Sequence, residues 1–175
     1  MTKTDITESA AIQQRLAEMQ AQAVSQSEIA LHWAGHNRQD LAIVFINMAK
    51  LMLLEGEGLG SESEFWVLTN RSAVAELARQ PKLALDLAVR AHDLGEKLFL
   101  GDALKLAVAR GNLGKALAGA DRPEEARKRL SEGLFGVSTA SHSPPAHTPE
   151  PLKKYYREAF MDYARALQKL PARPR

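Results

Sequence analysis

Apolar residues recur along most of the chain three and four residues apart, and no segment shows the strict alternation of a half-buried strand. Glycine and proline fall mostly between these periodic segments. The pattern predicts a long N-terminal helix from about Glu8 to Ala34, with a break near Ser25–Ser27 left open. Further helices are expected at about 40–54, 64–78, 81–97, 102–118, 123–135 and 151–170.

The segments between these helices have a different composition. Residues 55–63 (EGEGLGSES) are expected to form a linker, and the Ser- and Pro-rich residues 137–150 a mobile loop. Residues 171–175 are expected to be a disordered tail. Pro81 and Pro123 suit the first turn of a helix, because proline has no N–H to lose there. Gly119 is expected to take the left-handed conformation that closes a helix.

A repeat of 42 residues runs through the chain. Ala42, Ala84 and Ala126 are separated by this interval, as are Asn70 and Asn112. The residues four and seven positions after each alanine also correspond: Ile46, Ala88 and Leu130, then Ala49, Ala91 and Gly133. Small residues at these places let two helices approach closely, and the large ones fill the remaining space. A repeat of this length is typical of stacked helical hairpins, which usually bind other proteins.

The third unit resembles a tetratricopeptide repeat. Leu113-Gly114 corresponds to the Leu-Gly pair of that family's first helix, and Leu117 to the large residue three positions later. Ala126, Leu130 and Gly133 correspond to its small, large, small series. The 42-residue period, longer than the usual 34, is similar to that of kinesin light chain-type repeats. HEAT and armadillo repeats overlap in length but fit the small-large-small series less well.

The resemblance implies an all-α, right-handed α-solenoid in one domain covering residues 1–175. Its three hairpins would span about 22–54, 64–97 and 102–135. An extra N-terminal helical segment and a C-terminal capping helix at 151–170 would complete it. The aromatic face of that last helix could instead lie in the groove and block it.

The resemblance also implies a binding site, since the first helices of such hairpins line a concave groove. An asparagine there often bonds the backbone of a bound peptide, which suits an amide because it both donates and accepts. The predicted groove residues are Trp66, Asn70, Ala73, Val108, Asn112 and Lys115. The partner would be a peptide or helix of another protein, and the chain an adaptor, chaperone or regulatory subunit. Alternatively, Asn70 and Asn112 form hydrogen bonds only within their own hairpin.

Self-association is the alternative function. Residues 41–54 are apolar on nearly every side, so one hairpin partner cannot cover them. The stripe of Ile12, Leu16 and Met19 on the N-terminal helix is expected to cover this surface, because nothing else would bury that stripe; the alternative is a homo-oligomer that covers it. The charge is also uneven. Residues 1–64 hold nine acidic and four basic residues (−5), and residues 65–175 hold 12 acidic and 19 basic residues (+7). End-to-end stacking could follow, or these charges are simply solvated.

Other classes of function find little support in the sequence. With no cysteine, the chain offers no thiolate ligand or nucleophile, which fits the reducing cytoplasm. Charged residues interrupt positions 1–20, so no signal peptide is expected, and no apolar run is long enough to span a membrane. His32 and His36 have ligand spacing but no third ligand, so no metal site is expected. We expect no enzyme activity, cofactor, nucleic-acid binding or membrane association.

Overall fold

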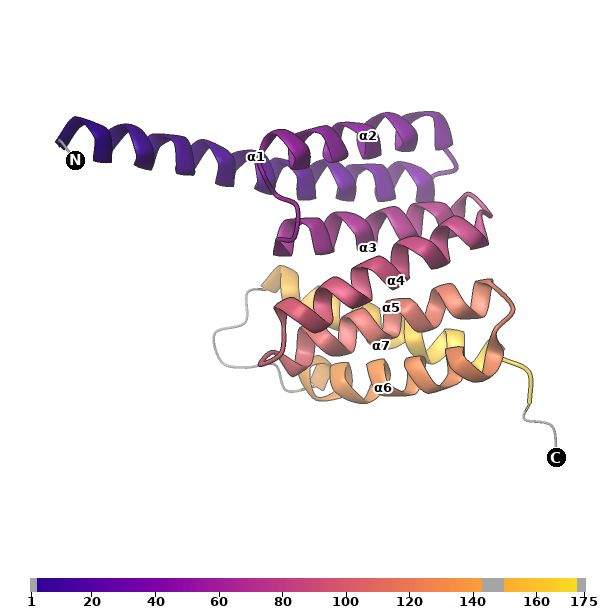
Figure 1. Cartoon of the computed structure of the whole chain (residues 1–175). Coiled ribbons are helices and arrows are strands. Elements are labelled where there is room, and N and C mark those ends of the chain that lie inside the picture. The colour runs from indigo at the N-terminus through magenta and orange to yellow at the C-terminus, as the bar shows by residue number, and fades with distance from the viewer. Residues whose placement is uncertain (1–2, 143–149, 173–175) are drawn as a thin grey trace. The chain divides into compact units, whose positions relative to one another are not determined.

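The computed structural model describes residues 3–142 and 150–172, and all regular structure in these ranges is helical. The predicted all-α class is therefore confirmed for the described chain. Its helices are α1 (Lys3–Gly35), α2 (Gln39–Glu55), α3 (Glu62–Leu77), α4 (Pro81–Leu98), α5 (Ala103–Gly119), α6 (Pro123–His142) and α7 (Glu150–Lys169) (Figure 1). Within the described ranges, no helix is both long and apolar enough to cross a bilayer.

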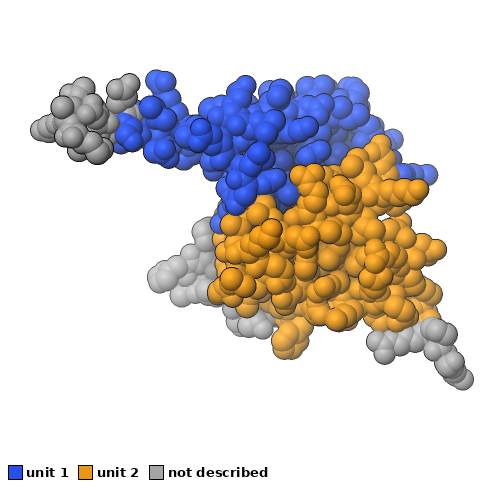
Figure 2. All heavy atoms as spheres, in the orientation of Figure 1, with its two compact units in different colours: residues 1–79 blue, residues 80–175 orange. Residues whose placement is uncertain are grey.

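The chain divides into two compact units, Met1–Arg79 and Gln80–Arg175 (Figure 2). Unit 1 contains α1, α2 and α3, and unit 2 contains α4 to α7. The boundary falls between the two helices of the predicted second hairpin. Neighbouring helices pack within each unit, while a single solenoid domain over residues 1–175 stays a prediction.

Unit 1 is built on the α1–α2 hairpin, with α3 packed mainly against α1. Alanines fill the contact between the helices, because their small side chains allow the backbones to approach closely. Two clusters form the core: Ala23, Ala49, Leu53 and Val67, and further along Ala30, Ala34, Ala42 and Val74. The repeat positions Ala42 and Ala49 are thus confirmed as core residues.

Unit 2 centres on α5, which contacts α4, α6 and α7. Its contact with α6 depends on glycines. A Cβ added at Gly133 would lie 2.5 Å from the Cα of Gly111, and one at Gly114 would lie 2.7 Å from the backbone N of Leu130. Leu130 and Ala126 are fully buried, as the small-large-small series predicts.

The turn that follows the first helix of each hairpin has the same backbone conformation. Asn37, Arg79 and Asp121 have φ angles of 62°, 56° and 59°, and successive positions are 42 residues apart. The repeat is therefore present in the backbone as well as in the sequence. The expectation for Gly119 was wrong, because Gly119 is the last residue of α5 and the left-handed position falls on Asp121.

Two element boundaries differ from the sequence-based expectation. α1 is one unbroken helix to Gly35, and Ser27 inside it donates from its hydroxyl to the carbonyl oxygen of Val24. α6 continues to His142, so the predicted loop at 137–150 begins later than expected. Half of that loop, residues 143–149, lies outside the described residues, as does most of the predicted tail (173–175).

Candidate protein-binding site

Three of the six predicted groove residues lie on α3 in unit 1. The helix begins at Ser61, whose hydroxyl accepts the backbone N–H of Glu64 and so satisfies one of the unpaired donors of the first turn. Trp66, Asn70 and Ala73 follow at spacings of four and three, which places them on one side of the helix. All three are half-buried. The indole N–H of Trp66 donates to Oε1 of Glu62 at 3.2 Å.

Asn70 is tied to α1. Its Nδ2 donates to the hydroxyl oxygen of Ser27 at 2.8 Å, and Ser27 is fully buried. The bond joins α3 to α1 within unit 1, so Asn70 has a partner inside the fold, although not within its own predicted hairpin. Asn70 nevertheless keeps part of its surface accessible.

The other three predicted residues, Val108, Asn112 and Lys115, lie on the side of α5 that faces α7. The hydroxyl of Tyr163 lies 3.1 Å from the carbonyl oxygen of Val108 and 3.0 Å from Oδ1 of Asn112, so its single proton is shared between two acceptors. Nζ of Lys115 lies 3.6 Å from Oδ2 of Asp162. Val108 itself is fully buried. In unit 2, the C-terminal helix therefore occupies the predicted binding face of α5.

A glycine on α5 makes room for this helix. A Cβ added at Gly111 would lie 2.2 Å from Cε2 of Tyr163, closer than any real contact, so the Tyr163 ring rests directly on the glycine backbone. Tyr163 is 1% exposed, which makes it one of the largest fully buried side chains. α7 is held in place by aromatic packing, a shared hydrogen bond and an ion pair.

Tyr155 lies two helical turns before Tyr163 on α7 and is half-buried. Burial disfavours the charged phenolate and raises the pKa of Tyr155 to about 12. This tyrosine therefore stays neutral well above the pH at which an exposed one would ionise.

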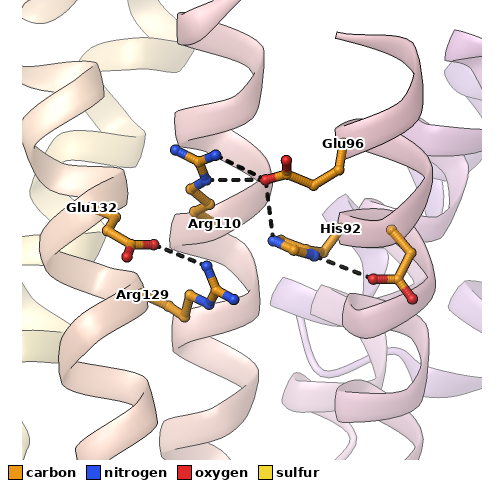
Figure 3. A network of polar contacts seen from close by, with 6 residues as sticks. His92, Glu96, Arg110, Arg129 and Glu132 are labelled. Atoms are coloured by element: carbon orange, nitrogen blue, oxygen red, sulfur yellow. Dashed lines mark hydrogen bonds and ion pairs between the residues drawn. The ribbon is translucent and has the colours of Figure 1, made fainter. Parts of the chain in front are cut away.

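A network of polar contacts joins α4 to α5 on another side of unit 2 (Figure 3). Nε and one terminal nitrogen of Arg110 donate to Oε1 of Glu96 at 3.2 and 2.9 Å. Nε2 of His92 is 3.6 Å from the same oxygen, and its Nδ1 is 3.4 Å from Asp93. Figure 3 also shows Arg129 and Glu132, which form a pair within α6 at 3.0 Å.

The charged groups of this network are paired with one another, and the pair of Arg110 and Glu96 links α5 to α4. Arg110 bridges to a carboxylate 14 residues away in sequence, across the turn between α4 and α5. His92 and Glu96 are four apart on one helix, a spacing that sequence reasoning can find. Nothing local marks Arg110 as their partner, and the sequence analysis missed it.

Among the described residues, no group of three or more His, Cys, Asp and Glu side chains is arranged to hold a metal ion. His32 and His36 do approach each other, with ring centroids 4.3 Å apart. Nδ1 of His36 lies 2.9 Å from the carbonyl oxygen of His32, which is a contact within the end of α1.

Comparison of the chain with protein-family models, with curated proteins and with solved structures gives no significant match. The likeness to tetratricopeptide repeats therefore rests on the spacing of residues in the sequence.

Proposed function

We propose that the protein is a non-catalytic protein–protein interaction module that binds a helix or peptide segment of a partner protein. One observation carries this proposal: α7, an amphipathic helix, already lies on Val108, Asn112 and Lys115 of α5. Recognition of an amphipathic helix by an apolar surface with a few placed polar groups is a common mode of peptide binding. The chain would act as an adaptor, chaperone or regulatory subunit, and its lack of cysteine fits the cytoplasm.

The chemistry of the α5 face defines the helix that it would accept. Gly111 provides space for a flat aromatic ring. The carbonyl oxygen of Val108 and Oδ1 of Asn112 accept a hydrogen bond from a hydroxyl group, and the ammonium group of Lys115 attracts a carboxylate. A partner helix would carry a tyrosine preceded by an acidic residue, as in Asp162-Tyr163. The α3 residues Trp66, Asn70 and Ala73 are proposed as a second contact surface, on unit 1.

Under this proposal α7 competes with the partner. A covalently attached helix has a high effective concentration, so the apparent affinity for an external helix is the intrinsic affinity multiplied by the fraction of time that α7 is undocked. Weakening α7 should therefore strengthen binding of a helix added from outside.

The test uses a fluorescent peptide of residues 150–170, titrated into the full chain by fluorescence polarisation. Tyr163→Ala in the protein removes the ring that docks α7, and the peptide should bind this variant at least tenfold more tightly than the unmodified chain. Met161→Ala, on the exposed side of the same helix, is the matched control and should leave the affinity unchanged. A peptide carrying the Tyr163→Ala change should not bind. The proposal fails if the normal peptide does not bind a Tyr163→Ala protein that retains α5–α6 packing by circular dichroism.

A further inference from the structure

Unit 1 leaves one face of α2 uncovered. The inner face holds Ala42, Ala49 and Leu53 in the core. The outer face carries five large apolar side chains that are 38–57% exposed: Ile43, Val44, Met48, Leu51 and Leu54. Together they expose on the order of 500 Å² of apolar surface, near the upper end of the largest patch on a typical monomer. A surface of this size usually marks an interaction site.

The N-terminal part of α1 is also without packing inside unit 1. Figure 1 shows α1 running past the ends of α2 and α3. We call residues 3–18 the arm. From residue 9 to residue 15 every side chain is exposed, and Ile12 is 51% exposed. Packing resumes at Leu16, which is half-buried, and at Met19: a Cβ added at Gly56 would lie 3.3 Å from the carbonyl oxygen of Leu16 and 3.1 Å from the Cβ of Met19. The expectation that Ile12, Leu16 and Met19 would cover the outer face of α2 in the same chain is not met.

An unsupported helix of this length is only marginally stable in water, because helical segments in proteins depend on packing of an apolar face. The arm therefore needs a surface to lie on. At 1.5 Å per residue it is roughly 24 Å long, and α2, with 17 residues, is about 25 Å long. The two unpaired surfaces match in length.

They also match in the spacing of their apolar residues. Ile12 and Leu16 on the arm, with Met19 where packing within unit 1 has resumed, are separated by four and then three residues, and so are Val44, Met48 and Leu51 on α2. Two helices with this spacing pack side by side with their side chains interlocked, as in coiled coils. Asn47, exposed among the apolar residues of α2, is the kind of polar residue that fixes register in such a contact.

We propose that two copies of this chain form a symmetric dimer in which the arm of each copy lies on the outer face of the partner's α2. A two-fold axis makes this contact twice, so each copy buries both its arm and its α2 face. The α2 face and the exposed surface of the arm, polar side chains included, together approach the roughly 800 Å² per partner of a standard stable interface. The residues of this surface are not among those proposed to bind a helix on α5 and α3. Dimer formation and helix binding can therefore be tested independently of each other.

The first test is the mass in solution, measured by light scattering during size-exclusion chromatography. The full chain should have twice its monomer mass of 19.2 kDa, with little effect of salt because the contact is apolar. Ile12→Glu in the arm and Leu51→Lys on α2 should each raise the dissociation constant at least tenfold. Leu83→Glu, a change at a similarly exposed leucine on α4, should leave the dimer intact.

Mixing the two weakened variants distinguishes arm exchange from any other dimer. A mixed dimer of Ile12→Glu and Leu51→Lys chains keeps one unaltered arm on one unaltered α2 face, so the mixture should recover dimer that neither variant forms alone. Tryptophan fluorescence of Trp33 and Trp66 reports whether unit 1 remains folded. The proposal is overturned if the unmodified chain is a monomer at high micromolar concentration, if Ile12→Glu remains fully dimeric, or if the mixture stays monomeric.

A cross-link gives an independent check, since the chain contains no cysteine. Equal amounts of Leu16→Cys and Met48→Cys chains, altered at the middle residue of each apolar stripe, should form a disulfide-linked mixed dimer on mild oxidation. Replacing the second variant with Leu83→Cys should abolish that product. A mixed dimer that forms equally with both would contradict the proposed contact.

Discussion

Asn70 and Asn112 occupy the same position of the repeat, yet they have different partners. Asn70 donates to Ser27, on α1, the first helix of unit 1. Asn112 accepts from Tyr163, on the helix that ends unit 2. The repeat therefore fixes where the amide stands on its helix, while the neighbouring helix decides what it bonds. Position in a repeat predicts placement better than it predicts role.

The two units can be followed separately, which makes this comparison testable. Both tryptophans, Trp33 and Trp66, belong to unit 1, and all three tyrosines lie on α7 in unit 2. Tryptophan fluorescence thus reports unit 1, and tyrosine second-derivative absorbance reports unit 2. Because the two units can unfold separately, each signal is expected to give its own midpoint of unfolding.

The largest expected effect on stability comes from removing a core side chain in one of the two units. Leu130→Ala removes a fully buried side chain from the α5–α6 contact and should lower the free energy of unfolding by about 2–5 kcal/mol. In urea titrations the tyrosine signal should shift to lower urea and the tryptophan signal should shift less. Leu83→Ala, on the exposed side of α4, should shift neither appreciably. Equal shifts of both signals after Leu130→Ala would show that the units unfold as one.

Alkaline pH should also act on unit 2 selectively. The pKa of Tyr155 is raised by burial to about 12 in the folded chain, against roughly 10 when unfolded. Between these values the unfolded chain has lost the proton and the folded chain has kept it, so stability is fully present below pH 10 and falls as pH rises towards 12. The loss is at most about 2–3 kcal/mol. Urea titrations at several pH values should show it in the tyrosine signal, and Tyr155→Phe should flatten the dependence.

Removing the partner of each asparagine tests the comparison directly. Ser27→Ala and Tyr163→Phe each delete one hydroxyl and leave an asparagine short of a hydrogen bond, which should cost about 1–2 kcal/mol. Ser27→Ala should shift the tryptophan signal and Tyr163→Phe the tyrosine signal. If Tyr163→Phe instead shifts only the tryptophan signal, the assignment of Asn112 to α7 is wrong.

The smallest expected effect concerns the turns. A left-handed conformation strains a side chain such as arginine by about 1 kcal/mol, while glycine adopts it readily. Arg79→Gly should therefore stabilise the fold by up to about 1 kcal/mol. Asn37→Gly should gain less, because asparagine tolerates this conformation. Thermal unfolding measures the stabilisation in the two variants. A larger gain from Asn37→Gly than from Arg79→Gly would contradict the prediction.

The sequence predicted the features that depend on local spacing. The 42-residue period placed Ala42, Ala126 and Leu130 in the interior, and all three are fully buried. The proline-started helices α4 and α6 begin at Pro81 and Pro123, as expected. These features follow from helical geometry and side-chain size, which act over a few residues.

Features that depend on distant partners were not predictable in the same way. Arg110 donates to Glu96 across a turn, and Tyr163 donates to the carbonyl oxygen of Val108, which lies 55 residues earlier in the sequence. The sequence around Arg110 and Tyr163 contains no pattern that would identify these partners. The extension of α6 to His142 was missed because serine, threonine and glycine are poor helix formers, and packing of Gly136 on Ala107 outweighs that weak preference.

The recurrence of one backbone conformation at Asn37, Arg79 and Asp121 also bears on how such a chain can change its length. A segment cut out between two of these residues and rejoined would leave the ends in the same conformation and the helices in the same rotational phase. Insertions or deletions of other lengths would turn the alanine faces away from their neighbours. Duplication or loss of one 42-residue segment is therefore the change of length that would preserve the conformation of these turns and the spacing of the alanines.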